Sequence, residues 1–311
     1  MEKDKFKMAK QKAEQVIPPK KKFMDGFKDL CHTRHQYPVW ADLWELFALT
    51  IMNPLTKQMY EQDETLKKVW QEREDRYLSI IKKYKKDEVQ TITEMFAALV
   101  EEFQIHPFQD FAGQIYMELG ISNNNAGQFF TPYSVCGLMA QVTQDHESIR
   151  QTVKDKGWYC MYDCACGGGA TMIAGLEQAN NEFHRLNWRN HVMVNANDID
   201  IVCCSMCYVQ LSLIGVAAIV TCSNALMQGE VNFYKEPEKV WFTPEYFSDV
   251  WVQRRFFNGL DINMWKNPNC GFGALFKSPE KPQEANSSES EDEDEWAEFD
   301  DVESSDDEDW E

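Results

Sequence analysis

Residues 163–173 have the sequence DCACGGGATMI, in which an aspartate precedes three consecutive glycines and a run of helix-forming residues. The segment just before, residues 158–164 (WYCMYDC), is a short apolar run typical of a buried strand. Glycines here allow a tight turn from strand to helix and let a ligand approach the backbone N–H groups at the helix start. Because any such turn needs glycine, a nucleotide-like ligand and a purely structural turn are equally open on this stretch alone.

The chain after the glycine segment alternates between apolar runs and helical patterns. Residues 191–196 (HVMVNA) and 217–222 (AAIVTC) are predicted strands, and residues 239–242 are a possible fourth. Helical segments at residues 170–180 and 201–213 separate the first three. Apolar strands that alternate with helices predict an α/β fold with a Rossmann-like, doubly wound parallel sheet.

Asp198 follows the second predicted strand in the way that Asp163 follows the first. An acidic residue at that place hydrogen-bonds ribose hydroxyls in dinucleotide sites. Asp198 or the nearby Asp200 could equally serve as N-cap of the next helix. Since there are two aspartates, the ligand-binding role and the capping role are compatible.

The first third of the chain is predicted to be helical. Apolar residues recur at spacings of three and four in residues 40–51 and 92–103, and the charged residues 57–88 between them suit a long exposed helix. The first of these helices is expected to end before Pro54. These patterns predict a helical domain over residues 36–120.

Charge is concentrated at the two ends of the chain, whose formal net charge is −20. Residues 1–35 are rich in lysine and are predicted to be a flexible, solvated and partly helical arm, with contacts to DNA or to the acidic tail as alternatives. Residues 284–311 hold 16 of the 51 acidic residues and no lysine or arginine, so the other residues carry 31 basic against 35 acidic side chains. Residues 277–311 are predicted to be a disordered acidic tail. This balance excludes a nucleic-acid-binding protein that relies on global positive charge.

The ten cysteines are clustered or adjacent, unlike the spaced cysteines of a disulfide framework. Residues 1–7 (MEKDKFK) lack the apolar region of a signal peptide, and no stretch reaches the roughly 18 apolar residues of a transmembrane helix. We therefore expect a reduced, cytoplasmic protein without membrane contact. A zinc site is the weaker alternative, and no metal is expected. The ligands of that alternative zinc site would be Cys164, Cys166, Cys203, Cys204 and Cys207.

Residues 127–135 (GQFFTPYSV) precede a short predicted helix. Thr131 and Pro132 suit a helix N-cap followed by a proline at the first helical position. That structural explanation does not account for the Gly-Gln pair and the two aromatic residues before the cap.

In this order, the segments resemble gamma-type adenine-specific DNA methyltransferases, in particular the modification subunit of type I restriction-modification systems. That family has a Gly-x-Phe-Tyr/Phe-Thr-Pro segment, matched at residues 127–132, and an Asp-Pro-Ala-Cys-Gly-Ser-Gly-Gly loop, which here is DCACGGGA at residues 163–170. Its Leu-x-Gly end after the second motif corresponds to residues 210–215 (QLSLIG). The family's Asp-x-x-Gly-x-x-Tyr helix is matched by Asp110, Gly113 and Tyr116. The resemblance covers about residues 90–226.

The resemblance implies an S-adenosylmethionine-dependent, site-specific DNA methyltransferase that modifies the N6 amino group of adenine. Its α/β domain would span residues 121–276. DNA would be the substrate, another restriction-modification subunit would be a possible partner, and the setting would be restriction-modification or a mobile element. Carried over by position, the cofactor-binding residues would be Phe129, Thr131, Pro132, Asp163, Cys166, Gly167, Gly169 and Asp198.

The family's catalytic Asn-Pro-Pro-Tyr/Phe motif follows its fourth strand, where it holds and stacks on a flipped adenine. After the possible strand at residues 239–242, this chain has TPEY, so that Pro244 and Tyr246 match while Thr243 replaces asparagine. We take Thr243, Pro244 and Tyr246 as the degenerate catalytic motif. Residues 267–270 (NPNC), which keep Asn-Pro without the aromatic residue, are the alternative.

The sheet is expected to be truncated, because residues 243–276 are too few for three further strand–helix units of about 25–30 residues each. Two functions therefore stay open. The chain is either an adenine methyltransferase or a catalytically inactive relative that acts as a binding or antirestriction protein through its acidic tail.

Overall fold

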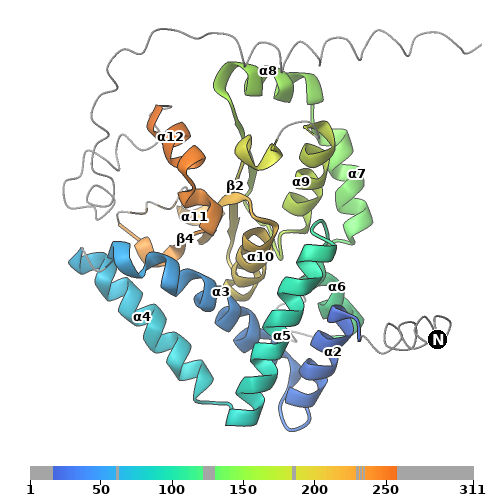
Figure 1. The fold of residues 1–311 in the computed structure, drawn as a ribbon, viewed down its shortest axis with the longest axis vertical. Helices are drawn as coiled ribbons and strands as arrows, with labels where there is room; N and C mark the ends of the chain where they lie inside the picture. The colour runs from blue at the N-terminus through green and yellow to red at the C-terminus, as the bar shows by residue number, and fades with distance from the viewer. Residues whose placement is uncertain are drawn as a thin grey trace, which may run out of the picture. The chain divides into compact units, whose positions relative to one another are not determined.

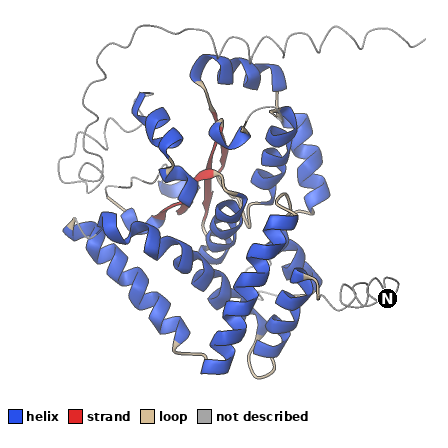
Figure 2. Cartoon of the chain, in the orientation of Figure 1, coloured by secondary structure: helices blue, strands red, loops and turns tan. Residues whose placement is uncertain are grey.

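A computed structural model describes residues 17–60, 63–121, 130–183, 187–228, 231, 233 and 235–257. All of these described residues belong to one compact unit, in which helices surround a small central sheet (Figures 1 and 2). Three features of the sequence lie outside the described residues: the expected acidic tail, residues 1–16 of the expected arm, and residues 267–270.

The N-terminal part of this unit is helical, as expected. Its helices are α2 (Pro19–Leu30), α3 (Gln36–Tyr60), α4 (Glu64–Ile81), α5 (Lys86–Ile105) and α6 (Phe111–Glu118). An aromatic core holds them together, since the Phe23 ring meets the Phe111 ring edge-on at 5.1 Å and Trp40 lies 5.4 Å from Trp44. Helix α3 also packs against the α/β part, so the two parts of the chain are in direct contact.

Two predictions for this helical part are wrong. Residues 19–30 of the expected arm form α2, which is packed against α5 and not flexible, because Phe23 and Phe27 on one face are fully buried while lysines occupy the other. Helix α3 does not end before Pro54 but continues to Tyr60. Helix α4 supports it there, since the Trp70 Nε1–H donates to the Asn53 carbonyl at 3.1 Å.

The α/β part contains a four-stranded sheet with the order β1-β2-β3-β4. Its strands are β1 (Tyr159–Asp163), β2 (Val192–Asp198), β3 (Ala217–Cys222) and β4 (Val240–Phe242). The first three strands are parallel, as predicted, and α9 (Ala170–Glu182) and α10 (Ile201–Ile214) connect them.

The fourth strand corrects the prediction of a wholly parallel sheet, because β4 pairs antiparallel with β3. Val240 pairs with Thr221, near the carboxyl end of β3. The connection between the two strands therefore starts and finishes at the same edge of the sheet, and the strand that follows must run in the opposite direction. The sheet is mixed rather than parallel.

Further helices enclose this sheet. They are α7 (Tyr133–Thr143), α8 (His146–Lys156), α11 (Ala225–Gln228), α12 (Asp249–Phe257) and the 3₁₀ turns η1 (Trp188–Asn190), η2 (Pro237–Lys239) and η3 (Pro244–Phe247). Figure 1 shows α9 on one side of the strands and α12 on the other. Tyr246 of η3 and Trp251 of α12 pack against Met193 and Ala217 of the sheet.

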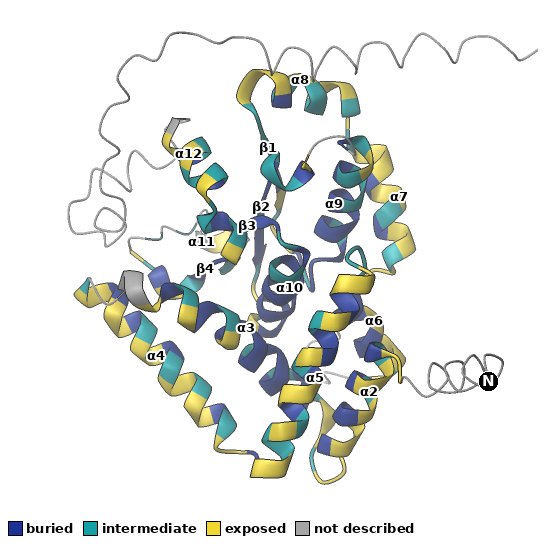
Figure 3. Cartoon of the chain, in the orientation of Figure 1, coloured by how far each residue is buried: buried dark blue, intermediate teal, exposed yellow. Residues whose placement is uncertain are grey.

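Helix α10 is the centre of the core and is buried along most of its length (Figure 3). Cys203, Cys204 and Cys207 lie on it as small apolar side chains.

Within the described part of the chain, every cysteine is a free thiol, and no three His, Cys, Asp or Glu side chains are grouped so that they could hold a metal ion. None of the described helices has the length and apolar character needed to cross a membrane.

Candidate functional site

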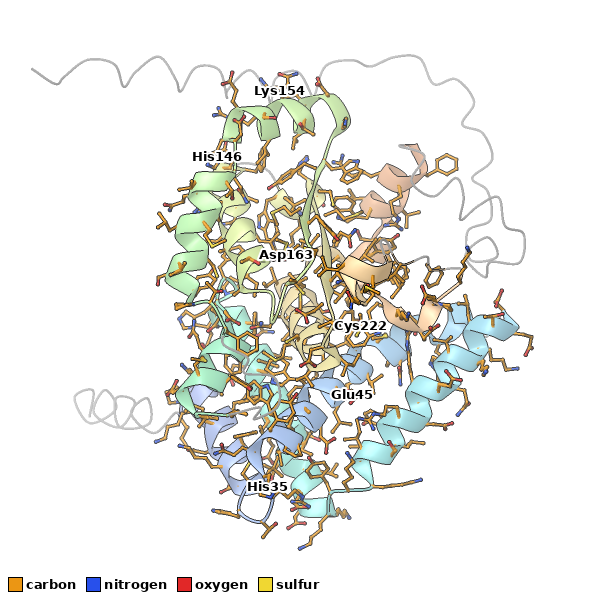
Figure 4. All side chains as sticks on the ribbon, turned by 180° about the vertical axis from the view of Figure 1, so that it is seen from behind. His35, Glu45, His146, Lys154, Asp163 and Cys222 are labelled. Carbon is orange, nitrogen blue, oxygen red and sulfur yellow. The ribbon has the colours of Figure 1, made fainter. Side chains whose placement is uncertain are left out.

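The carboxyl ends of the three parallel strands lie at one edge of the sheet. Asp163 ends β1, Asp198 ends β2 and Cys222 ends β3. Asp163 pairs with Ala196, which lies two residues before Asp198, and Asp198 pairs with Cys222. The ends of the three strands are therefore neighbours at this edge of the sheet. Figure 4 labels Asp163 and Cys222 in the middle of the molecule. In open α/β sheets, ligands bind outside this edge.

The glycine segment forms the turn from β1 into α9. Gly167 and Gly169 have φ angles of 53° and 95°, in the left-handed region that L side chains rarely adopt. Gly169 is the N-cap of α9, and a Cβ there would lie 3.0 Å from Cys207 Sγ. The glycines therefore meet two needs, a turn of unusual conformation and close packing of the loop on α10.

Asp163 organises the glycine loop from the end of β1. Its Oδ1 accepts the Ala165 N–H at 3.0 Å, and its Oδ2 accepts the Thr171 hydroxyl at 2.6 Å. These bonds hold both the turn and the first residues of α9, and each carboxylate oxygen keeps a further lone pair for a ligand.

Asp198 reaches the same loop from the end of β2. Its Oδ2 accepts the Gly167 N–H at 2.8 Å, while its Oδ1 accepts the Asp200 N–H at 2.9 Å. Asp200 is the N-cap of α10 and accepts the Val202 N–H at 2.8 Å. The capping role therefore belongs to Asp200, and Asp198 ties the second strand to the glycine loop.

Asn197 connects all three strand ends, a role that the sequence patterns did not indicate. Its Nδ2 donates to the carbonyls of Cys164 at 3.1 Å and Ser223 at 3.0 Å. Its Oδ1 accepts the hydroxyls of Thr221 at 2.8 Å and Ser223 at 2.7 Å. An asparagine near the end of a partly apolar, largely buried strand was the signal available, because a buried amide needs such partners.

Gln210 of α10 supports the glycine loop from behind. It is fully buried, and its Nε2 donates to the Gly168 carbonyl at 2.7 Å and to Asp110 Oδ1 at 3.3 Å. Its Oε1 accepts the Ala112 N–H at 3.0 Å. Asp110 Oδ1 also accepts the Gly113 N–H at 2.9 Å, and burial raises the pKa of this carboxyl group. Gln210 therefore links the glycine loop to Asp110, which lies 100 positions earlier in the sequence.

The segment before α7 lies beside the same loop. A Cβ at Gly167 would lie 3.5 Å from the ring of Phe130, which itself packs edge-on against Tyr116 at 5.0 Å. Thr131 and Pro132 are exposed at the start of α7. The N-cap is Pro132 and makes no side-chain capping bond, so the expected capping by Thr131 is wrong. Phe129 lies outside the described residues.

Cys166 faces the protein interior and is not positioned to react. It is buried, and hydrogen bonding to Cys207, followed by burial, raises the pKa of its thiol well above the ordinary value. Its backbone N–H donates to the Asn197 carbonyl at 2.9 Å. Cys166 thus holds the loop through its backbone and its packing, as a neutral thiol.

The residues expected to be catalytic are not brought to this site. Thr243 is fully buried, donates its hydroxyl to the Val216 carbonyl at 2.7 Å and accepts the Ala218 N–H at 2.8 Å. Val216 and Ala218 lie at the amino end of β3, about four residues or roughly 13 Å from its carboxyl end.

Tyr246 is also buried and is stacked by Arg255, whose guanidinium carbon lies 3.7 Å from the ring centroid. Pro244 is exposed next to it, on the same turn η3. The placement contradicts the assignment of Thr243, Pro244 and Tyr246 to a flipped base next to the glycine loop. The physical reason is the antiparallel direction of β4, which carries the residues after it to the opposite edge of the sheet.

Comparison with known proteins gives two family matches. A family model described as RhsPI matches residues 59–139. No curated protein and no solved structure matches the chain. A family model described as N-6 DNA methylase matches residues 109–266, about half of the 311 residues, and includes the glycine loop, Asp198 and Gln210. The chain belongs to the N-6 DNA methylase family.

Proposed function

We propose that the chain binds S-adenosylmethionine at the carboxyl edge of the sheet and, as an adenine-N6 DNA methyltransferase, modifies a flipped adenine in DNA. The observation that carries the proposal is the carboxylate of Asp198, which meets the Gly167 N–H at 2.8 Å while Asp200 takes over the capping of α10. Two strand ends and a glycine loop then share one site, as a nucleoside ligand requires.

The residues at this edge fit the chemistry of the cofactor. A carboxylate at Asp198 suits the two ribose hydroxyls, and one at Asp163 suits the ammonium group of the methionine part. Ile199 and Ile201, next to Asp198, are 69% and 42% exposed and offer an apolar surface to a purine ring. When bound, the cofactor would supply a methyl group activated by its positively charged sulfur.

The protein's own contribution to such a reaction is placement. The adenine amino group is a weak nucleophile, and acceptor groups must orient it toward the methyl group at the same edge of the sheet. Thr243 and Tyr246 lie at the other edge, so we do not assign the base to them. Residues 131–132, exposed at the entrance of α7, are proposed to contact the cofactor, as is Phe129.

A second candidate is a catalytically inactive relative that keeps the cofactor site and acts as a binding or antirestriction protein through its acidic tail. The observation in its favour is the position of Thr243, since the degenerate motif faces away from the cofactor edge. For either candidate we propose DNA as the nucleic-acid partner and a cytoplasmic restriction-modification or mobile-element setting. A type I modification subunit would also have a second subunit as partner.

A methyl-transfer assay separates these candidates. Tritiated S-adenosylmethionine is incubated with unmethylated phage DNA and with the wild-type chain, Asp198→Ala or Asp155→Ala. Asp155 is an exposed aspartate on α8, away from the strand ends, and serves as the matched control. An active enzyme gives labelled N6-methyladenine with the wild type and the control, and much less with Asp198→Ala.

Cofactor binding without labelled DNA would instead favour the inactive relative. The absence of both binding and transfer would overturn the proposal.

A further inference from the structure

Two thiols that the proposed function does not use meet at the carboxyl edge of the sheet. Cys222 ends β3, and Cys204 lies in the first turn of α10. The Cys204 sulfur lies 3.4 Å from the carbonyl oxygen of Thr221, the residue just before Cys222. The two thiols are also hydrogen-bonded to each other, so this edge holds a pair of sulfurs in contact.

The two thiols of this pair differ in exposure and in acidity. Cys204 is fully buried, whereas Cys222 is partly exposed. The Cys204 S–H donates to the Cys222 sulfur, and this hydrogen bond lowers the pKa of the Cys222 thiol, although burial, Asp198 and Asp200 oppose the effect. Lys239 also lowers this pKa. Because the thiolate is the nucleophilic form of cysteine, Cys222 is the member of the pair that reacts first with an electrophile from solvent.

A second thiol pair nearby has the same kind of contact but no access to solvent. Cys166 and Cys207 are hydrogen-bonded to each other, and both are buried. Reactivity of a thiol depends on exposure as well as on thiolate character, so an oxidant in solution reaches Cys222 and not this second pair. Cys166 and Cys207 therefore serve as an internal control for any reaction at Cys222.

We propose that Cys204 and Cys222 are an oxidation site, at which hydrogen peroxide converts the two thiols into a disulfide. The Cys222 sulfur attacks one peroxide oxygen and the O–O bond breaks. The second oxygen takes the thiol proton and leaves as water, so that Cys222 becomes a sulfenic acid. The Cys204 sulfur then attacks the Cys222 sulfur, an S–S bond forms, and the S–O bond breaks. Hydroxide leaves with the Cys204 proton as water, and the two sulfurs have passed two electrons to the peroxide.

The disulfide acts on the segment that carries Asp198. In the reduced chain the Cys204 sulfur lies 3.5 Å from the Asp198 carbonyl oxygen, and the Cys222 sulfur lies 3.8 Å from the Ile199 carbonyl oxygen. A disulfide has no S–H to donate to either carbonyl, and it draws the two sulfurs to about 2.0 Å. Since Asp198 and Ile199 are proposed to hold the ribose and the purine ring, oxidation weakens cofactor binding. This consequence rests on the proposed function, whereas the disulfide itself does not.

Peptide mapping of the full-length chain tests the disulfide without cofactor or DNA. The reduced chain is treated with hydrogen peroxide, denatured with N-ethylmaleimide to block the remaining thiols, and digested with chymotrypsin without reduction. Chymotrypsin cleaves after Tyr208 and Leu211, so the peptides that carry Cys204 and Cys222 stay together only through a disulfide. We expect this linked pair in the wild type and in the control Cys164→Ser, which removes an exposed thiol at the same edge.

Fragment ions and variants assign the two sulfurs. The fragments of the linked peptides should place the bond at Cys204, with Cys207 and Cys166 blocked by N-ethylmaleimide. The linked pair should be absent from Cys222→Ser, which changes a partly exposed side chain. In Cys204→Ser the reaction should stop at the sulfenic acid of Cys222, which dimedone traps. The map of the wild type decides the question even if Cys204→Ser fails to fold.

Three results of this mapping would overturn the proposal. The first is recovery of Cys222 as a blocked thiol after peroxide treatment. The second is a disulfide from Cys222 to Cys164 or to a second copy of the chain. The third is oxidation of the Cys166–Cys207 pair to the same extent, which would mean that exposure does not select the site.

Calorimetric titration of S-adenosylmethionine into the reduced and the oxidised wild type tests the effect on the cofactor site. We expect about two- to tenfold weaker binding after oxidation, the worth of one hydrogen bond, and recovery with dithiothreitol. Cys222→Ser should bind equally with and without peroxide. Equal affinity of the oxidised and reduced wild type would overturn the effect on the site. A reduced chain that binds no cofactor would overturn the proposed function instead, while the peptide map still decides whether the disulfide forms.

Discussion

Gln210 offers the strongest test of how the glycine loop is held. Replacing it by alanine removes the bond to the Gly168 carbonyl at 2.7 Å and the bond from the Ala112 N–H at 3.0 Å. Both backbone groups would lose this partner in a site where Gln210 is fully buried. Asp110 would also lose one of its two donors.

The cost follows from these contacts. Each buried group left unsatisfied costs about 1–3 kcal/mol, so the two backbone groups together cost about 2–6 kcal/mol. The higher helix propensity of alanine returns only a few tenths of a kcal/mol. A domain is stable by about 5–15 kcal/mol, so we expect a large decrease in the free energy of unfolding. The loop would also be less ordered, so that affinity for S-adenosylmethionine should fall.

Urea unfolding followed by circular dichroism measures the effect. The matched control is Gln151→Ala, which removes a similar side-chain bond, from Gln151 Nε2 to Asp155 Oδ1 at 2.9 Å, on the exposed surface of α8. This control should change stability by no more than about 0.5 kcal/mol. The same urea midpoint and slope for the two variants would show that Gln210 does not hold the glycine loop.

Three further substitutions test other parts of the structure. Burial raises the pKa of Asp110, so protonation of this carboxyl group stabilises the folded state. This stabilisation is complete below the ordinary aspartate pKa of about 3.9 and is lost as pH rises through the raised pKa. Urea midpoints at several pH values should therefore show the wild type gaining stability relative to Asp110→Asn as pH falls from 7 to 4, and the opposite trend would contradict a raised pKa. Thr243→Val removes two buried hydrogen bonds and should cost about 2–6 kcal/mol in urea unfolding, with no change in cofactor affinity by calorimetry. Arg73→Met removes hydrogen bonds at 3.1 Å to the Pro237 and Val240 carbonyls, so it should lower the melting temperature. The control Arg76→Met should lower it clearly less, because the exposed ion pair of Arg76 with Glu45 is worth at most about 1 kcal/mol. Equal melting temperatures would count against the link between α4 and β4.

Patterns within one element were enough to predict much of the fold. The apolar run at residues 217–222 is β3, with both ends in place, because buried strands are marked by their own composition. Residues 1–35 were harder. Lysine content suggested an arm, yet Phe23 and Phe27 lie four apart on a helix whose other face carries the lysines. The lysines on one face of α2 therefore hid the apolar pattern of its buried face.

Features that depend on the path of the chain could not be predicted in this way. The connection from β3 to β4 starts and finishes at the same edge of the sheet, so β4 runs antiparallel to β3. This direction places Thr243 at the amino edge, away from the glycine loop. In the site, too, features of local motifs were predicted and features set by distant residues were not. Gly167 and Asp198 were expected from local motifs, and the structure joins them at 2.8 Å. Asn197 and Gln210 act through partners far away in sequence, so local patterns do not show which groups they bind.

Isothermal titration calorimetry tests whether Asp198 and the glycine loop form a cofactor site. S-adenosylmethionine is titrated into the wild type, Asp198→Ala and the control Asp155→Ala, each checked for folding by circular dichroism. We predict saturable binding at one site in the wild type and the control, and at least about tenfold weaker binding in Asp198→Ala, since hydrogen bonds to a charged group contribute about 1.5–3 kcal/mol. No binding at millimolar cofactor, or equal affinity in all three proteins, would contradict a cofactor site at Asp198.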